Sequence, residues 1–304
     1  MSQRLLIWNS NSGRADTAAT LHEWFPTHST SFIDVCTEPD LTSVISLAVE
    51  RGCDTVIAAG GDGTINSVVN ALMAIAIDSR PRLGIIPLGT ANDLARTLGI
   101  PASVETACEL IERDNRLQVD VVRIRNQKID RFFINVATGG NGSRVSEAIT
   151  DETKATWGAF CYLRGAIAVL TDLVSFRVNL DCDEETFEGI DAWAILVANG
   201  KSNAGHIVIA PEASVTDGLL DLIIVLDGTA IDMVKIAASV MQGNFLESDQ
   251  VVYRKAKRCS LTSTPSMKFT LDGEVVDDAN AAEGNTIQFE VVPNALSIVV
   301  GELA

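Results

Sequence analysis

Apolar and polar positions change their spacing along the chain, and the change comes near residue 118. Before it, short apolar runs alternate with stretches in which apolar residues recur every three or four positions. A short run predicts a buried strand, and the longer spacing predicts an amphipathic helix. The predicted strands are 4–8, 31–36, 55–59 and 83–87, and the predicted helices are 16–25, 41–51, 65–77 and 94–98.

This alternation of strand and helix predicts an α/β domain with a doubly wound parallel sheet. Polar residues follow each of the four predicted strands: around Asn9, at Thr37, from Gly60 to Thr64 and around Thr90. In open parallel sheets, ligands bind beyond the carboxyl ends of the strands. We therefore expect these turns to converge on a nucleotide pocket.

After residue 118, strand-like runs follow one another and long helices become rare. This pattern predicts an antiparallel β-sandwich with inserted helices. We place the first domain at 1–122 and the second at 123–293. The predicted strands are 118–125, 131–137, 175–181, 191–199, 219–226, 260–271 and 286–292, and the predicted helices are 143–150, 156–173 and 230–243.

The chain has 304 residues and a formal net charge of −17. This charge argues against a nucleic-acid partner, which requires a basic face, and against long-range attraction to anionic lipid. The six cysteines form no C-x-x-C pair, no secretory pattern opens the sequence, and no apolar run is long enough to span a bilayer. We therefore expect a cytoplasmic protein.

The stretch Gly60-Gly61-Asp62-Gly63-Thr64 lies between a predicted strand and a predicted helix. The first N–H groups of a helix and the positive end of its dipole attract anions, and glycine lets a phosphate approach the backbone. A carboxylate beside phosphate needs a cation between them, and Mg²⁺ is the usual one. We favour a phosphate site here over a strand-turn-helix corner whose glycines serve geometry alone.

Three polar residues, Thr90, Asn92 and Asp93, follow the strand that ends at Pro87. One of them would suffice to cap the next helix. We expect Thr90 to contact a phosphate or ribose, and Asn92 and Asp93 to face the acceptor substrate.

Two later turns carry paired carboxylates. Asp217-Gly218 followed by Asp221 is either a plain turn or a site for a hard cation, and the residues leave both open. Asp272-Gly273-Glu274 is typical of a hairpin turn, in which Glu274 is either a solvated charge or a general base.

Taken together, four blocks of sequence resemble the diacylglycerol kinase catalytic-domain family, in its branch of soluble bacterial lipid kinases. The resemblance implies an N-terminal ATP-binding domain, a C-terminal β-sandwich with the active site in the cleft between them, and a tail, 294–304, that returns to the first domain. The blocks are GGDGTIN at 60–66, PLGTANDLAR at 87–96, APEA with DGLLD at 210–221, and LDGE at 271–274.

The resemblance also implies roles for single residues. Asp62 would lie beside a catalytic Mg²⁺, Glu274 would be the general base, and Asp221 would hold a structural Mg²⁺ with carbonyls of Gly218 and Ile223. The residues that would contact ATP are Asn9, Ser10, Asn11, Ser12, Gly13, Thr37, Gly60, Gly61, Asp62, Gly63, Thr64, Ile65, Asn66, Ser67 and Thr90. This chain departs from the family pattern at Ser67, where an acidic residue is common, and at Ala91, where glycine is usual.

The implied activity is ATP-dependent transfer of the γ-phosphate to a hydroxyl of a lipid such as diacylglycerol, during transient contact with a membrane surface. Two alternatives stay open: an NAD kinase-like enzyme with a soluble substrate, and a nucleotide-binding regulator without transfer activity. The apolar segment 157–170 either rests on a membrane or forms a buried core helix. The sequence leaves a homodimer open.

Overall fold

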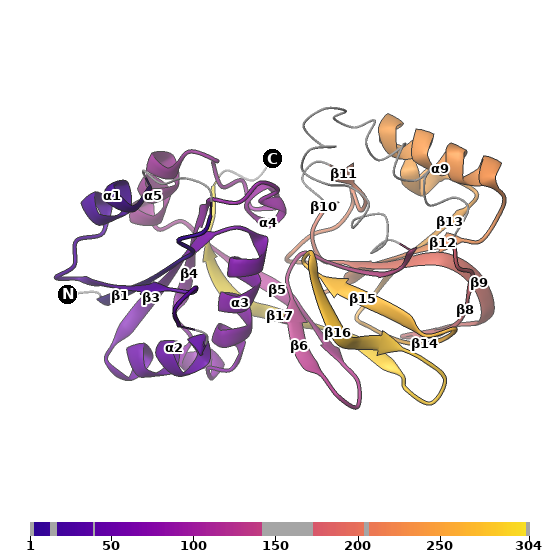
Figure 1. Cartoon of the computed structure of the whole chain (residues 1–304), viewed down its shortest axis with the longest axis horizontal. Helices are drawn as coiled ribbons and strands as arrows, with labels where there is room; N and C mark the ends of the chain where they lie inside the picture. Colours follow the sequence, from indigo (N-terminus) through magenta and orange to yellow (C-terminus); the bar gives the residue numbers. More distant parts are fainter. Residues whose placement is uncertain (1–2, 13–16, 39, 142–172, 204–206, 302–304) are drawn as a thin grey trace.

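The computed structural model describes residues 3–12, 17–38, 40–141, 173–203 and 207–301. Figure 1 shows two lobes, with the α/β elements in one and most of the antiparallel strands in the other. Predicted helix 143–150, nearly all of predicted helix 156–173, and the apolar segment 157–170 lie outside the described residues.

The first lobe is the predicted doubly wound sheet. Its parallel strands run in the order β4-β3-β1-β2, so the chain reverses direction across the sheet at β1 and β3. Helices α1 and α5 pack together on one side, and α2 and α3 on the other (Figure 1). The elements are β1 (Gln3–Trp8), α1 (Thr17–Trp24), β2 (Thr30–Asp34), α2 (Leu41–Glu50), β3 (Cys53–Gly60), α3 (Asp62–Met73), η1 (Ile77–Ser79), β4 (Arg82–Pro87), α4 (Asp93–Thr97) and α5 (Val104–Arg113).

Helix α5 was missed in the sequence, although its pattern was present. Val104, Ala107, Cys108 and Ile111 are buried at helical spacing, and Ser103 caps the first turn. This is the stripe expected of a helix with one face in the core.

The second lobe is antiparallel and contains the predicted sandwich. Helix α9 covers one side of it, where Ile236 packs with Trp193 and Ile223 in a core of their own (Figure 1). The elements are β5 (Arg116–Arg125), β6 (Asp130–Phe133), β7 (Val136–Gly140), β8 (Phe176–Cys182), β9 (Glu185–Ala198), β10 (Ser202–Asn203), β11 (Ile207–Val208), β12 (Leu220–Leu226), α9 (Ala230–Gln242), η2 (Phe245–Glu247), β13 (Val251–Ala256), β14 (Arg258–Thr264), β15 (Met267–Leu271), β16 (Glu274–Ala281) and β17 (Ile287–Val299).

Two of the predicted strands were wrong, because the structure divides each of these runs into two separate strands. The run 260–271 breaks at Pro265, which has no N–H to donate to a ladder. The run 131–137 breaks at Ile134 and Asn135, whose N–H groups are bound by a side chain instead of a neighbouring strand.

A ribbon of two long strands, β5 and β17, joins the two lobes. Val119 and Ile298 belong to the core of the first lobe, and Val122 and Phe289 belong to the core of the second. The end of β17 also pairs with β4 of the parallel sheet. The last described strand therefore returns to the first lobe.

Asp120 is a buried carboxylate where this ribbon crosses between the lobes. It accepts hydrogen bonds from the N–H of Gly218 at 2.7 Å and from the N–H of Asn294 at 2.7 Å. One side chain thus fixes a loop of the second lobe and the bend in β17.

We expect Asp120→Asn to lower the free energy of unfolding by about 1–3 kcal/mol, because the amide can accept only one of these two bonds and its NH₂ would face the other donor. Urea denaturation measures the change. The control is Asp278→Asn, a half-exposed carboxylate paired with Lys128 at 3.0 Å, for which we expect less than about 0.5 kcal/mol. Equal losses in the two variants would contradict this role of Asp120.

Candidate active site

The turns after the parallel strands contact one another at one edge of the sheet, as the sequence predicted. The N–H of Asn9 donates to the carbonyl of Ala59 at 3.1 Å, and the N–H of Leu88 donates to the carbonyl of Gly60 at 2.8 Å. The amide of Asn9 lies 3.4 Å from the hydroxyl of Thr64. These bonds tie the turns after β1, β3 and β4 into one unit.

Glycine is required where the turns after β3 and β4 touch. A Cβ on Gly89 would lie 2.5 Å from the Cα of Gly61, which is closer than real Cβ atoms come to backbone. Gly61 also precedes the first residue of α3 and offers no capping side chain. The helix begins at Asp62, three residues earlier than predicted, so its first turn faces the edge where anions are favoured.

Asp62 supplies a carboxylate with unusual surroundings. Its Oδ1 atom is buried, and no described residue donates a hydrogen bond to it. Burial, followed by the negative charge of Asp93, raises the pKa of Asp62 to about 6. A buried carboxylate with a free oxygen beside a second acid fits a magnesium ligand.

The described residues contain no group of three acidic, histidine or cysteine side chains arranged to hold a metal on their own. Mg²⁺ in kinases is usually held by one or two carboxylates, with water and substrate phosphates completing the shell. Asp62 therefore fits a metal that arrives with a nucleotide.

A tight hairpin turn between β15 and β16 reaches toward α3 from the second lobe. Asp272 and Gly273 both have positive φ, which is typical of a two-residue hairpin loop. The Asp272 carboxylate accepts four hydrogen bonds, from Asn66 Nδ2 at 2.7 Å and from three successive backbone N–H groups at 2.9–3.0 Å, those of residues 134, 135 and 136. Burial raises the pKa of Asp272, and the four hydrogen bonds oppose that rise.

Glu274 follows this turn and lies over the start of α3. Its Oε1 atom is 3.0 Å from the position that a Cβ on Gly63 would occupy. Arg131 lies 3.9 Å from its other oxygen. Burial raises the pKa of Glu274, with Arg131 acting in the opposite direction. Glu274, from the second lobe, thus lies against Gly63, the residue after Asp62 in the first turn of α3.

Asn66, predicted to contact ATP, has a different role in the structure. It is buried and donates to Asp272 and to the carbonyl of Phe132. Asn70, one turn further along α3, bonds the same carbonyl and accepts from the N–H of Phe132. These two side chains fasten α3 to the second lobe. Asn70 was missed, although its spacing of four from Asn66 was a usable signal.

Asn92, predicted to face the acceptor, has its amide occupied within its own turn. It has positive φ, donates to the carbonyl of Gly89 at 2.7 Å and accepts from the N–H of Gly89 at 3.0 Å. Asp93 is buried, and its Oδ1 atom lies 3.6 Å from Nη1 of Arg96. Its negative charge contributes to the raised pKa of Asp62. A substrate contact of either residue stays a prediction.

The other predicted ATP contacts are spread around this edge. Ile65 is in the core, Thr90 is exposed at the turn after β4, and Ser67 faces a groove of about 590 Å³ between α2, α3 and the β5–β6 hairpin. Thr37 donates through its hydroxyl to the carbonyl of Asp34 at 3.1 Å. Ser10, Asn11 and Ser12 form the turn after β1, and Gly13 lies outside the described residues.

The predicted structural metal site at Asp221, Gly218 and Ile223 stays a prediction. Asp221 is wholly buried in β12, which has strands on both sides. Ile223 is in the middle of the same strand, paired with β9 and β13, and Gly218 is in the turn before the strand. The Asp221 carboxylate instead faces two side chains of β13, Tyr253 and Lys255.

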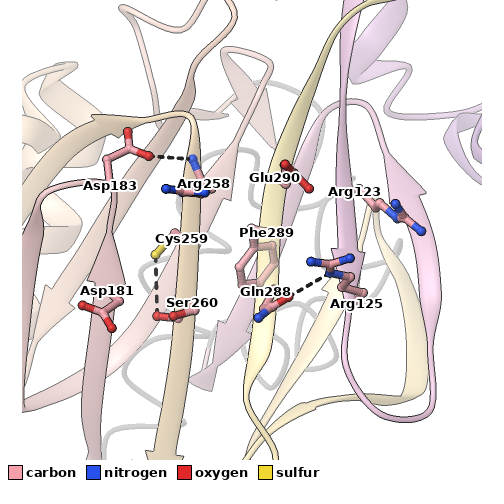
Figure 2. A pocket seen from close by; sticks show the side chains of 10 residues that line it. All are labelled: Arg123, Arg125, Asp181, Asp183, Arg258, Cys259, Ser260, Gln288, Phe289 and Glu290. Atoms are coloured by element: carbon pink, nitrogen blue, oxygen red, sulfur yellow. Dashed lines mark hydrogen bonds between the residues drawn. The ribbon is translucent and has the colours of Figure 1, made fainter.

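A groove of about 420 Å³ lies away from these residues, on strands of the second lobe (Figure 2). It contains three arginines, but Arg123 is paired with Asp130 and Arg125 donates to Gln288 at 2.8 Å. Three acidic side chains, Asp181, Asp183 and Glu290, share it. This balance of charge does not favour a triphosphate.

Comparison with known proteins agrees with the geometry. Residues 3–124 match the family described as diacylglycerol kinase catalytic domain, and residues 135–300 match the YegS C-terminal NAD kinase beta sandwich-like domain. A diacylglycerol kinase of Staphylococcus haemolyticus is 32% identical over 88% of this chain and 81% of its own length. The chain belongs to the diacylglycerol kinase catalytic-domain family.

A second member of this family, a diacylglycerol kinase of Bacillus subtilis, is 31% identical over 90% of both chains. The crystal structure of a diacylglycerol kinase from Bacillus anthracis shares the fold with a TM-score of 0.78, at 24% identity over 99% of this chain and 97% of that one. An NAD kinase of Archaeoglobus fulgidus, solved with ATP, shares it with a TM-score of 0.55, at 13% identity over 99% and 94%. Membership in this kinase family supports phosphoryl transfer as the chemistry.

No helix in the described part of the chain is both long and apolar enough to cross a membrane.

The pKa of Asp62 gives a stability prediction with a definite sign. Because its folded pKa of about 6 exceeds its ordinary 3.8, this group favours the folded state at low pH, and that contribution is lost as the pH rises through 6. Without Mg²⁺, we expect Asp62→Asn to raise the free energy of unfolding at pH 8 by about 1–3 kcal/mol, and the gain to vanish near pH 4. Denaturation across this pH range measures it, and an equal loss of stability at every pH would contradict the assignment.

Proposed function

We propose that this chain transfers the γ-phosphate of ATP to a hydroxyl group of a lipid, with diacylglycerol as the first candidate. The observation that carries the proposal is the position of Glu274 over Gly63, one residue from Asp62, at the start of α3. A base and a magnesium-type carboxylate thus lie at a helix terminus that favours phosphate.

The chain's own groups have separate tasks in this reaction. The N–H groups at the start of α3 bind the terminal phosphates. Glu274 accepts the proton of the lipid hydroxyl as its oxygen bonds to the γ-phosphorus, while the bond from phosphorus to the β-phosphate oxygen breaks and ADP leaves. A partly buried carboxyl with a raised pKa holds that proton more readily than a solvated one. Arg131, beside Glu274, offsets negative charge as the phosphoryl group moves.

Asp62 would hold Mg²⁺ together with the nucleotide, and the metal would neutralise charge on the phosphates. The two relatives that are 31–32% identical to this chain, both diacylglycerol kinases, support a lipid alcohol as acceptor. The acceptor would enter from a membrane surface during transient contact.

Radiolabelled ATP tests the proposal against its rivals. The purified chain is incubated with mixed micelles of diacylglycerol, phosphatidylglycerol, a sphingoid base or an isoprenoid alcohol, and separately with NAD. We expect ATP-dependent label in a lipid product. Label on NAD alone would favour an NAD kinase-like enzyme, and tight ATP binding without any product would favour a regulator.

We expect Glu274→Gln to lower kcat by about 10²–10⁴-fold, because the amide cannot accept the hydroxyl proton, with ATP binding retained in calorimetry. The matched control is Glu290→Gln, which removes an exposed carboxylate in the groove of Figure 2 and should leave kcat unchanged. A fully active Glu274→Gln protein would rule out this base.

The Gly63→Ala variant tests whether turnover depends on the position of Glu274 without lowering the stability of the fold. Alanine favours a helix by up to about 1 kcal/mol over glycine, so the thermal midpoint should hold or rise. The added Cβ would lie 3.0 Å from the Glu274 carboxylate and displace it, so we expect turnover to fall by about 10²-fold. Normal turnover would mean that Glu274 does not act from this position.

A further inference from the structure

The Lys255 ammonium lies beside Asp221, the carboxylate to which the family resemblance would assign a second magnesium ion. Lys255 Nζ is 2.8 Å from the carbonyl of Glu212, 3.0 Å from Asp217 Oδ2 and 3.8 Å from Asp221 Oδ1. These three oxygens come from the loop before β12 and from β12 itself. All three oxygens therefore surround the positive charge of a side chain, the Lys255 ammonium.

Strand pairing fixes this arrangement. Lys255 is directly opposite Asp221 in the antiparallel pair β12–β13, so both side chains project from the same face. Tyr253, two residues before Lys255 on that face, donates its hydroxyl to Asp221. The turn at Gly218, which has positive φ, brings Asp217 back toward the same point. Since the sheet holds the lysine stem, the ammonium is set in place by the fold.

The oxygens suit an ammonium better than Mg²⁺. An ammonium has three donors and needs acceptors near 2.8–3.0 Å, whereas Mg²⁺ needs about six oxygens at about 2.0–2.1 Å. Two of the contacts match the first requirement. The carbonyls predicted to complete the metal shell, those near Gly218 and Ile223, belong to a turn anchored by Asp120 and to a central strand.

The charge in this cluster is not fully balanced. Two carboxylates face one ammonium, and Asp221 Oδ2 is buried with no hydrogen-bond donor among the described residues. If the ammonium were removed, two acids and one carbonyl would remain together, which is the chemistry of a hard-cation site.

We propose that Lys255 takes the place of the structural metal ion in this chain, so that the second lobe is stable without divalent cations, and that removing its ammonium creates a divalent-cation site at Asp217 and Asp221. This inference does not rest on the proposed kinase activity, because its readout is folding stability. In it, the lysine is the cation that offsets the buried carboxylate of Asp221 and the exposed carboxylate of Asp217.

Thermal unfolding of the full chain tests it, without nucleotide and with Asp62→Asn present in every protein so that the candidate active site contributes no metal response. We expect the thermal midpoint of the parent to be the same in EDTA and in 10 mM Mg²⁺ or Ca²⁺. This concentration would saturate a site with a Kd of about 0.1 mM. Lys255→Met keeps the apolar stem and removes the charge, so we expect a lower midpoint in EDTA that rises by about 3–6 °C with the cation.

Two variants sharpen the result. Lys257→Met removes the same charge from an exposed neighbour and should show no cation response. Adding Asp217→Asn to Lys255→Met should abolish the response. If Lys255→Met does not fold, equilibrium dialysis of the parent with Mn²⁺ still decides. A bound ion in the parent that Asp217→Asn removes, or a parent midpoint that falls in EDTA, would overturn the proposal.

Discussion

The Asp272 carboxylate is the constraint on which the candidate site depends. It accepts one hydrogen bond from Asn66 of α3 and three from the backbone where β6 gives way to β7. Four donors fix both oxygens of a side chain that sits in a two-residue turn. Since Glu274 follows two residues later, the same bonds that join the lobes also set its carboxylate against the first turn of α3.

This arrangement places several acids in one region. Asp62, Asp93 and Asp272 interact electrostatically, and burial raises the pKa of Asp62 to about 6. Negative charge held together without a cation costs stability, and an arriving metal-bound nucleotide would relieve it. The second acidic cluster, at Asp217 and Asp221, already has Lys255 beside it. The first cluster has Arg96 beside Asp93, whereas Asp62 itself has no basic side chain among the causes of its raised pKa.

The sequence was informative wherever a signal is local. Apolar spacing located the strands of the parallel sheet, and the short blocks around Asp62 and Glu274 indicated residues that the fold brings together. Reasoning from sequence failed where a residue's partner is distant along the chain. Asn66 bonds Asp272, 206 positions away, and Lys255 faces Asp221 across a strand pair that was not predicted. The broken strand at Ile134 has the same origin, because a distant carboxylate competes for its N–H.

A crystal structure of the full chain with Mg²⁺ and a non-hydrolysable ATP analogue would show directly whether the start of α3 binds the triphosphate. We expect the γ-phosphate at the N–H groups of residues 62–64, between the carboxylates of Asp62 and Glu274, with the hydrogen bond from Asn66 to Asp272 intact. A triphosphate bound elsewhere, such as in the arginine-containing groove of Figure 2, with Glu274 out of reach of the γ-phosphate, would contradict it.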